Sequence, residues 1–482
     1  MTVRLLIFAA IVAAATGVVE TQSSVTGRWR ALVLLPNGVT SEFIFDLKAD
    51  GANVTGTMTG APVTLGPGRL EGNTLTLNGI GPTKQEVTFV GQFTPTEIVF
   101  SAVSGQFPER YHFVARRDSR VELSGSVADP VFMRQALKQF NVPGVSIAVV
   151  RDFKIVQSYA YGVADAETGA PVTTRTLFQA ASISKPVAAM VSLRATQERR
   201  FGLDQDINTI LKSWRLPEGA FTGSSKVTPR TLMSHTSGTG DSFGFPGYVI
   251  GASVPTLQQI LDGRPPANGR AVRLERPPAT GYKYSGGGVM IQQLVLSDAV
   301  GKPFAAIATD WVLNPLGMAD STFEQPLSPT RQSSAARAHN AMGTRMGDPW
   351  RIYPEQAAAG LWSTPGDLAR FAIEVQQTVR GRSERVLSQA LAKEMITPVG
   401  VGPFGVGFEV SKQGEGWYFG HSGDTWGFAC DLLFHRTNGY GMVIMTNGDN
   451  GFALIAQLRR IIQREYKWDA LDAPIPRRYG PE

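Results

Sequence analysis

The segment that decides the fold of this chain is Phe178–Pro186 (FQAASISKP), which holds the only Ser-x-x-Lys pattern among the 482 residues. At the start of a helix, a serine three residues before a lysine places a hydroxyl and an amine on one helical face. The amine can accept or orient the hydroxyl proton, which a serine must lose before it attacks a carbonyl. The segment therefore predicts that Ser182 is a nucleophile and that Lys185 lies beside it.

Two further motifs follow this segment along the chain: Pro278–Gly288 (PATGYKYSGGG) and Phe419–Asp424 (FGHSGD). With the three motifs in this order, the chain resembles the serine β-lactamase-related family, which includes class C β-lactamases, DD-peptidases and family VIII esterases. The motifs of that family are Ser-x-x-Lys, Tyr-x-Asn, and Lys-Thr-Gly or His-x-Gly. The resemblance extends over residues 121–467 and includes three connecting stretches, residues 230–238, 314–323 and 359–371.

The resemblance implies roles for three residues. Ser182 would form an acyl-enzyme, and Lys185 would help to remove its proton, which requires an amine whose pKa is lowered by burial or by neighbouring charge. Tyr284 would be the partner base and the later proton donor to the leaving group. A phenol titrates near pH 10, so Tyr284 needs Lys185 nearby to act at neutral pH. The sequence leaves open whether Lys185 or Tyr284 is the principal base.

The third motif would complete the site. By the same resemblance, the backbone N–H groups of Ser182 and Asp424 would form the oxyanion hole. His421 and Gly423 would line the cleft next to them. His235, in the stretch His-Thr-Ser-Gly, is expected to shape the cleft wall and to be structural.

Two departures from the family pattern bear on the substrate. Gly286 stands where many members carry an asparagine, whose amide can bind a peptide-like substrate group and orient the lysine. His421 stands where many carry a lysine, and a histidine near its usual pKa of about 6.5 is mostly neutral at pH 7. Both changes favour an uncharged ester or amide over a penicillin, although some peptidases of this family also use histidine there.

A rival nucleophile lies at Gly240–Gly244 (GDSFG), which matches the Gly-x-Ser-x-Gly elbow of α/β-hydrolases. That elbow requires an apolar strand before the serine and a helix after it. Polar residues and glycine precede Ser242, and Phe-Gly-Phe-Pro-Gly follows it, so the context predicts a loop. Ser242 is therefore interpreted as a chance match.

The predicted fold class of residues 121–467 is α+β. A helix capped by Asp129 is expected from Pro130 to about residue 140, and a second helix over residues 452–466 is expected to close the domain. Antiparallel strands are expected at 145–150, 155–161, 404–410, 417–419, 426–434 and 440–445, with a long mixed region between them. The resemblance implies a β-lactamase/DD-peptidase-like antiparallel sheet flanked by helices, plus a helical subdomain.

Residues 23–118 have a different pattern, which predicts a small all-β domain. Seven short alternating runs are separated by turn residues: 28–34, 41–47, 53–58, 74–77, 86–90, 97–102 and 111–115. We expect an antiparallel barrel or sandwich of seven or eight strands. The sequence of this domain contains no cluster of titratable residues typical of a catalytic site. A spacer or envelope-binding role is therefore the preferred interpretation.

The two ends of the chain suggest processing and a loose tail. Residues 1–22 combine a charged start, an apolar run at 5–15 and a small-residue Ala-x-Gly site, which is typical of a signal peptide. The run is shorter than the roughly 20 apolar residues that span a bilayer, so export to the periplasm or medium is expected. Residues 468–482, rich in proline and arginine, are expected to be loosely ordered.

The composition of the chain argues against several classes of binding partner and cofactor. The net charge of +6 comes without any run of Lys and Arg, so nucleic acid is not an expected partner. Cys430 is the only cysteine and lies in an apolar, strand-like segment, which predicts a packed core residue. The five histidines show no ligand spacing, so neither a metal nor another cofactor is expected.

The sequence therefore predicts an exported serine hydrolase that acts through an acyl-enzyme, with a carboxylic ester as the preferred substrate. A D-amino-acid peptidase or amidase acting on cell-wall fragments is the alternative, followed by a weak β-lactamase. A non-catalytic envelope-binding protein is the alternative of another class. The sequence does not determine the oligomeric state, the acyl-chain preference or the ligand of the β domain.

Overall fold

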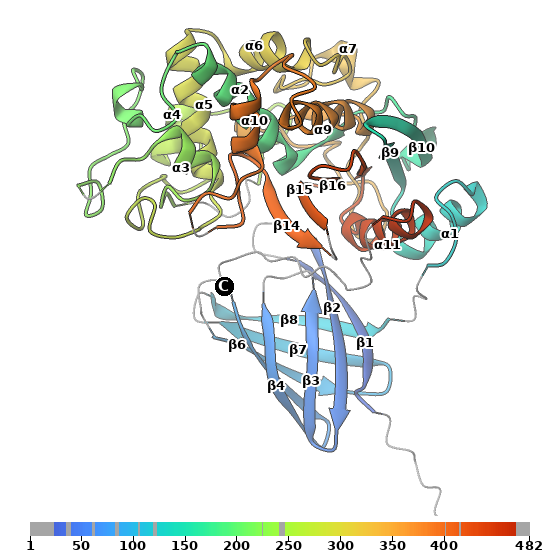
Figure 1. The fold of residues 1–482 in the computed structure, drawn as a ribbon. Coiled ribbons are helices and arrows are strands. Elements are labelled where there is room, and N and C mark those ends of the chain that lie inside the picture. Colours follow the sequence, from blue (N-terminus) through green and yellow to red (C-terminus); the bar gives the residue numbers. More distant parts are fainter. Residues whose placement is uncertain are drawn as a thin grey trace, which may run out of the picture.

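The computed structural model describes residues 24–34, 40–59, 63–81, 86–104, 107–118, 123–223, 225–240, 246–400, 402–413 and 416–468. The predicted signal peptide and the rival serine, Ser242, lie outside the described residues, as does the predicted tail except for Trp468. Figure 1 shows a β-barrel formed by the N-terminal strands (blue) and a larger part in which helices surround a sheet.

The N-terminal strands form a closed antiparallel barrel in which β1 pairs with both β2 and β8. This confirms the prediction of an all-β region with seven or eight strands, and its form is a barrel rather than a sandwich. The strands are β1 (Gly27–Leu34), β2 (Thr40–Asp50), β3 (Asn53–Thr59), β4 (Thr64–Glu71), β5 (Thr74–Ile80), β6 (Glu86–Phe93), β7 (Glu97–Ser104) and β8 (Phe107–Arg117).

Aromatic side chains fill the interior of the barrel. Phe45 and Phe100 stack with ring centroids 5.0 Å apart, and Phe113 lies 5.2 Å from Phe100. Phe89 meets Phe45 edge to face at 5.8 Å. All four side chains are buried. The interior is therefore a packed core, as expected for a small barrel whose inward positions are occupied by large residues.

The sequence analysis missed β4 because none of its residues is buried and its pattern is not an apolar alternation. The strand has the sequence TLGPGRLE, and its register with β5 shifts between Leu65 and Gly68. Proline cannot donate to a ladder, and glycine and proline inside a strand commonly mark a bulge. The closing of the barrel, rather than local propensity, holds this segment extended.

The larger part is built on a seven-stranded antiparallel sheet in the order β11-β10-β9-β17-β16-β15-β14. The two halves of the sheet come from opposite ends of this part of the chain and join at its centre, where Val150 lies opposite Gly441 and Ser146 opposite Met445. The strands are β9 (Gly144–Arg151), β10 (Lys154–Asp165), β11 (Ala170–Pro171), β14 (Glu409–Gln413), β15 (Gly416–Thr425), β16 (Phe428–His435) and β17 (Gly441–Thr446). A separate two-stranded sheet pairs β12 (Phe178–Gln179) with β13 (Trp362–Ser363).

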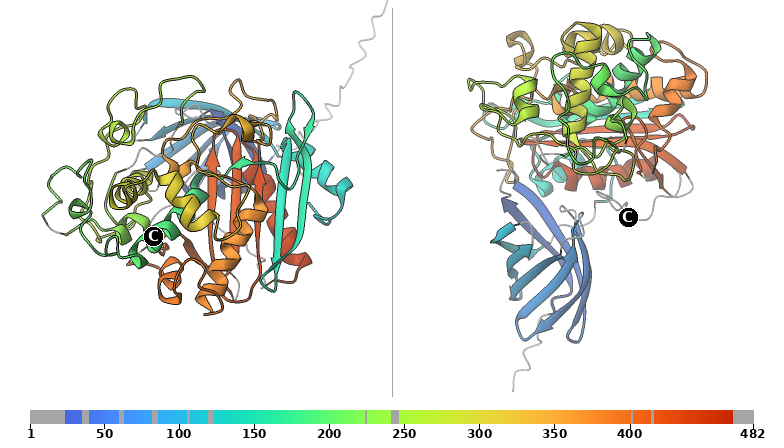
Figure 2. Two further views of the ribbon diagram at one scale, coloured as in Figure 1. Left: turned by 90° about the horizontal axis from the view of Figure 1, so that it is seen from above. Right: turned by 90° about the vertical axis from the view of Figure 1, so that its left-hand side faces the viewer.

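Helices cover both faces of the sheet, as Figure 2 shows. Alternate residues of β9 belong to two cores: Ile147 packs with α1 and α11, and Ala148 with the other helices. The helices are α1 (Pro130–Phe140), α2 (Ser184–Gln197), α3 (Pro229–Met233), α4 (Leu257–Asp262), α5 (Gly286–Val300), α6 (Phe304–Ala308), α7 (Pro329–Gln332), α8 (Gln356–Ala359), α9 (Pro365–Val379), α10 (Gln389–Met395) and α11 (Gly451–Glu465), with single turns η1 (Ala181–Ile183), η2 (Ile207–Thr209) and η3 (Thr309–Leu313).

Several predicted elements are confirmed at their expected positions. The Asp129 side chain accepts a hydrogen bond of 2.8 Å from the Val131 N–H and caps α1. The hairpin β9–β10 and the closing helix α11 are present, and Cys430 is fully buried in β16.

The predicted strand 404–410 is wrong over most of its length, because β14 begins only at Glu409. Residues 404–408 are a buried segment outside the strand, and Gly407 within it has a φ of +105°. Such a backbone angle is incompatible with a regular strand. The adjacent β15 is longer than predicted, so the whole third motif lies inside a strand.

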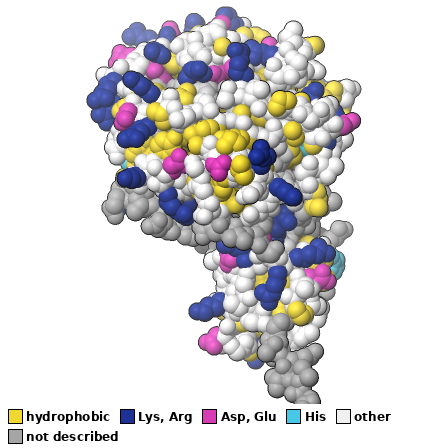
Figure 3. Space-filling model, turned by 90° about the vertical axis from the view of Figure 1, so that its right-hand side faces the viewer, with side chains coloured by type: hydrophobic (Ala, Val, Ile, Leu, Met, Phe, Trp, Pro, Cys, Tyr) yellow, Lys and Arg dark blue, Asp and Glu magenta, His cyan; other side chains and the backbone are white. Residues whose placement is uncertain are grey.

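Figure 3 shows the side of the molecule that carries α1 and β10 in Figure 1, and hydrophobic side chains gather on it. Val131 of α1 and Val156 of β10 are among the large hydrophobic side chains that the structure exposes. Over the described residues, no helix is both long and apolar enough to cross a membrane.

Candidate active site

Ser182 lies on a tight turn that leads directly into α2. It is the middle residue of η1, and Ala181 before it has a φ of +48°, which is unusual for a residue with a side chain. Ser184 holds this turn in place, because its hydroxyl donates to the Ala181 carbonyl at 2.5 Å and accepts from the Leu361 N–H at 3.0 Å. Ser182 itself is half-buried.

Lys185 lies next to Ser182, as the spacing predicts. Its side-chain amine donates to Ser182 Oγ at 2.9 Å and to the Ala358 carbonyl at 2.8 Å. Lys185 is only 3% exposed, so the amine sits in a poorly solvated place beside the hydroxyl. The Ala358 carbonyl, at the end of α8, had no signal in the sequence, because any residue can supply a backbone oxygen.

Tyr284 brings the second motif to the same place. Its ring centroid lies 5.0 Å from Lys185 Nζ, and its hydroxyl lies 3.5 Å from His421 Nε2. Ser285 follows as the cap of α5, its hydroxyl accepting from the Gly288 N–H at 2.9 Å. The helix therefore begins directly after the tyrosine and fixes its direction.

The glycines after Tyr284 are explained by close packing. A Cβ on Gly287 would lie 2.7 Å from the Gly240 carbonyl oxygen, and one on Gly288 would lie 2.8 Å from Thr239 Oγ1. The first turn of α5 thus rests directly against residues 237–240. Gly287 and Gly288 of the second motif are therefore needed for the close packing of α5 against these residues.

His421 is neutral in this site. Its Nδ1–H donates to the Ser422 carbonyl at 2.6 Å, which leaves Nε2 as an acceptor facing Tyr284. Burial, together with the nearby Lys185 charge, lowers the pKa of His421 to about 3. The third motif therefore presents no fixed positive charge to a substrate.

Gly423 allows β15 to touch the turn that carries Ser182. A Cβ on this residue would lie 2.3 Å from the Ala180 carbonyl oxygen, closer than real atoms approach. Asp424 is the next residue of β15 and pairs with Ala429 of β16, with its side chain exposed. Its backbone is therefore near Ser182, and the oxyanion role of the two N–H groups stays a prediction.

His235 is closer to the chemistry than the sequence indicated. It is 1% exposed, its ring centroid lies 4.3 Å from that of Tyr284, and its Nδ1 accepts from the Ser285 N–H at 3.1 Å. Phe404 packs against both rings, with centroids 4.8 Å from His235 and 5.9 Å from Tyr284. Phe404 was missed as a site residue because residues 404–410 were assigned to a strand.

The rival elbow lacks the strand it requires. Residues 234–240, which the structure describes, form no named strand, and Thr239 takes part only in an isolated bridge with Leu274. Serine elbows of α/β-hydrolases need a strand before the nucleophile. The described residues therefore give Ser242 no support as a nucleophile.

Glu355 is a buried carboxyl group at the start of α8, and the sequence analysis did not single it out. It is 1% exposed, and its Oε2 has no hydrogen-bond partner among the described residues. Burial raises the pKa of Glu355 to about 8. It is therefore a neutral acid at neutral pH, two residues after Tyr353 and three before Ala358.

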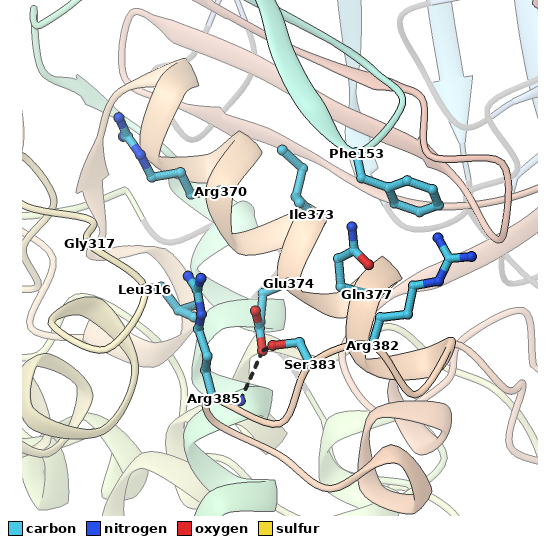
Figure 4. Close-up of a pocket in the computed structure, with 10 residues that line it drawn as sticks. All are labelled: Phe153, Leu316, Gly317, Arg370, Ile373, Glu374, Gln377, Arg382, Ser383 and Arg385. Atoms are coloured by element: carbon cyan, nitrogen blue, oxygen red, sulfur yellow. Dashed lines mark hydrogen bonds between the residues drawn. The ribbon is translucent and has the colours of Figure 1, made fainter.

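A separate hollow of about 570 Å³ lies beside α9 and shares no residue with the Ser182 site (Figure 4). Its one carboxylate, Glu374, accepts from Thr378 and Ser383 hydroxyls at 3.0 and 2.7 Å and from the Arg385 N–H at 3.3 Å. That carboxylate serves the structure rather than catalysis. Among the described residues, no group of three or more His, Cys, Asp or Glu side chains could hold a metal ion.

Comparison with known proteins gives a consistent result. A family model described as Beta-lactamase matches residues 132–464. The chain is 29% identical to Esterase EstB of Burkholderia gladioli, over 61% of this chain and 78% of that protein. It is 25% identical to Penicillin-binding protein 4 of Amycolatopsis lactamdurans, over 67% of this chain and 85% of that protein.

Two solved structures share the fold. The octameric penicillin-binding protein homologue from Pyrococcus abyssi superposes with a TM-score of 0.59 at 19% identity, covering 70% of this chain and 77% of the other. The D-amino acid amidase from Ochrobactrum anthropi superposes with a TM-score of 0.55 at 22% identity, covering 69% and 99%. At these identities the likeness concerns the fold alone.

The close approach at Gly423 leads to a first prediction. Gly423→Ala places a methyl group against the Ala180 carbonyl and pushes β15 away from the Ser182 turn. We expect hydrolytic activity to fall by about 100-fold, the effect of displacing reacting groups by about 1 Å. Gly219→Ala is the matched control, because no atom lies within 4 Å of its Cβ position. Equal activity of both variants, measured as kcat/KM, would contradict the prediction.

Glu355 leads to a prediction about pH. The pKa of Glu355 is about 8 in the folded state and 4.5 for the free group. Between these pH values the folded state therefore binds one more proton than the unfolded state. The free energy of unfolding consequently falls as the pH rises from 4.5 to 8. Glu355→Gln cannot ionise and escapes this loss. The Tm difference between variant and wild type should therefore grow in favour of the variant from pH 4.5 to pH 8. The exposed Glu384→Gln is the control, and a constant difference for Glu355→Gln would contradict the prediction.

Proposed function

Because the chain belongs to the Beta-lactamase family of serine hydrolases, we propose that it hydrolyses an uncharged carboxylic ester through an acyl-enzyme on Ser182. The observation that carries the proposal is the contact of 2.9 Å between Lys185 Nζ and Ser182 Oγ, with Tyr284 over the amine. The nucleophile and the amine come from one segment and the phenol from another about 100 residues later in the chain, and the three groups meet at one point, as acyl transfer requires.

The chemistry proceeds in two steps. In acylation, Ser182 Oγ attacks the ester carbonyl while its proton passes to the pair formed by Lys185 and Tyr284. The alcohol then leaves as Tyr284 returns a proton to its oxygen. In deacylation, water attacks the acyl-enzyme, the same pair takes the water proton, and Ser182 regains a hydroxyl. The N–H groups of Ser182 and Asp424 are assigned to the developing oxyanion.

The preference for an uncharged substrate rests on the third and second motifs. A neutral His421 offers a substrate carboxylate no fixed charge, unlike a lysine at that position. Gly286 has no side-chain amide with which to bind a peptide-like group. A relative named as an esterase, at 29% identity, supports the same choice.

The alternatives are a D-amino-acid peptidase or amidase acting on cell-wall fragments, then a weak β-lactamase. The relative named as a penicillin-binding protein supports the peptidase or amidase as the first alternative. A non-catalytic envelope-binding protein is disfavoured by the intact contact between Lys185 and Ser182.

Labelling with a fluorophosphonate probe tests the nucleophile. We expect Ser182→Ala to abolish labelling and to reduce ester hydrolysis to the background rate, because no other oxygen nucleophile occupies this position. Ser242→Ala is the matched control and should label like the wild type. Equal labelling of Ser182→Ala and wild type would overturn the proposal. A panel of p-nitrophenyl esters, D-alanyl peptides and a chromogenic cephalosporin then ranks substrates, and the esters should show the highest kcat/KM.

We further propose that the protein is exported and that residues 23–118 and 121–467 form separate domains. The apolar run at residues 5–15 supports export, and the filled aromatic core of the barrel supports a spacer or envelope-binding role for the first domain. Expression in a bacterium with a periplasm should yield a mature protein that begins near residue 23. Recovery of the uncleaved chain in the cytoplasm, measured by mass, would contradict export.

A further inference from the structure

His235 has an unfavourable conformation and an unfavourable location. Its φ is +60°, in the left-handed region that residues with side chains avoid, and its ring is 1% exposed. Residues held in such a region persist only where surrounding contacts determine them. The contacts of His235 therefore indicate why its backbone keeps this unfavourable angle.

Those contacts enclose Tyr284 on both sides along the chain. The Lys283 N–H donates to the His235 carbonyl at 2.9 Å, and the Ser285 N–H donates to His235 Nδ1 at 3.1 Å. Tyr284, between these two residues, packs against the His235 ring with the centroids 4.3 Å apart and the ring planes tilted by 33°. One residue thus holds the backbone before Tyr284, the backbone after it and the aromatic ring.

The protonation state of His235 suits this arrangement. To accept from Ser285, Nδ1 must carry a lone pair, so the single ring proton of the neutral imidazole is on Nε2. Burial is the main cause that holds the pKa of His235 well below its usual value, and the charge of Lys185 acts in the same direction. The hydrogen bond from Ser285 is therefore available throughout the neutral range.

We propose that His235 is a positioning residue that clamps Tyr284 over Lys185 and so sets the rate of acylation of Ser182. The inference rests on the proposed function, in which Tyr284 exchanges protons with the nucleophile and leaving group. The contact that substitution can remove is the hydrogen bond accepted by Nδ1, because the backbone carbonyl is the same in every variant. The contact between the rings is weaker and less directional than this hydrogen bond. Phe404 packs beside both rings, with its centroid 4.8 Å from that of His235 and 5.9 Å from that of Tyr284.

Two substitutions isolate the acceptor. Asparagine and glycine both tolerate a positive φ, and both lack the imidazole ring. The asparagine side-chain oxygen can take the place of Nδ1, whereas glycine offers no side-chain acceptor. We expect His235→Gly to lower the single-turnover acylation rate by about 100-fold and His235→Asn to stay within about tenfold of the wild type.

A double-mutant cycle with Tyr284→Phe separates positioning from general stability. If His235 acts through the Tyr284 hydroxyl, His235→Gly and His235→Asn should have the same rate in the Tyr284→Phe background, within about threefold. His339→Asn is the control: His339 is fully buried, and its Nε2 accepts from the Ala166 N–H at 3.1 Å in another part of the fold. Its effect should add to that of Tyr284→Phe. Additive effects for His235→Gly as well would overturn the proposal.

Hydrogen exchange of the Ser285 amide gives a readout that does not depend on activity. His235→Gly should accelerate this exchange and His235→Asn should not. If labelling depends on Ser182 but the two variants acylate and exchange alike, the positioning inference is wrong and the proposed function stands. If labelling does not depend on Ser182, the proposed function fails, and the assignment of His235 to acylation fails with it.

Discussion

The buried amine of Lys185 is the interaction on which the site depends. It lies between a hydroxyl and a backbone carbonyl, the oxygens of Ser182 and Ala358, and it lies under the ring of Tyr284. In a poorly solvated place its charge acts over a longer range than in water. Burial, and in the same direction the charge of Lys185, lower the pKa of His421, so the amine that contacts the Ser182 hydroxyl also helps to keep the opposite wall neutral.

Close backbone contacts allow the three motifs to meet around that amine. β15 can touch the turn of Ser182 because Gly423 has no Cβ, and α5 can begin against residues 237–240 because Gly287 and Gly288 have none. A side chain at any of these positions would separate the segments by more than a hydrogen bond tolerates. The glycines are thus part of the geometry that brings the three motifs together around Ser182.

Local sequence patterns predicted some elements of this fold, and elements held by distant contacts were not predictable from them. Helix α1 and strands β9, β10, β16 and β17 were predictable because their capping and apolar patterns are local. Strand β4 and the segment at Phe404 were not, since a strand without buried residues and a buried segment outside any strand both break the usual patterns. His235 was expected to be structural, and its hydrogen bonds hold the backbone on both sides of Tyr284.

The sequence by itself determined that Ser182 and Lys185 lie side by side, because a serine and a lysine three residues apart share a helical face whatever surrounds them. The order of the three motifs predicted the family, which the family model confirms. Only the tertiary structure decided how the other groups meet that pair. The Ala358 carbonyl, the Nδ1 of His235 and the neutral ring of His421 act through distance and burial. These contacts join segments that are 50 or more residues apart in the chain, as for His421 and Tyr284, whose positions differ by 137.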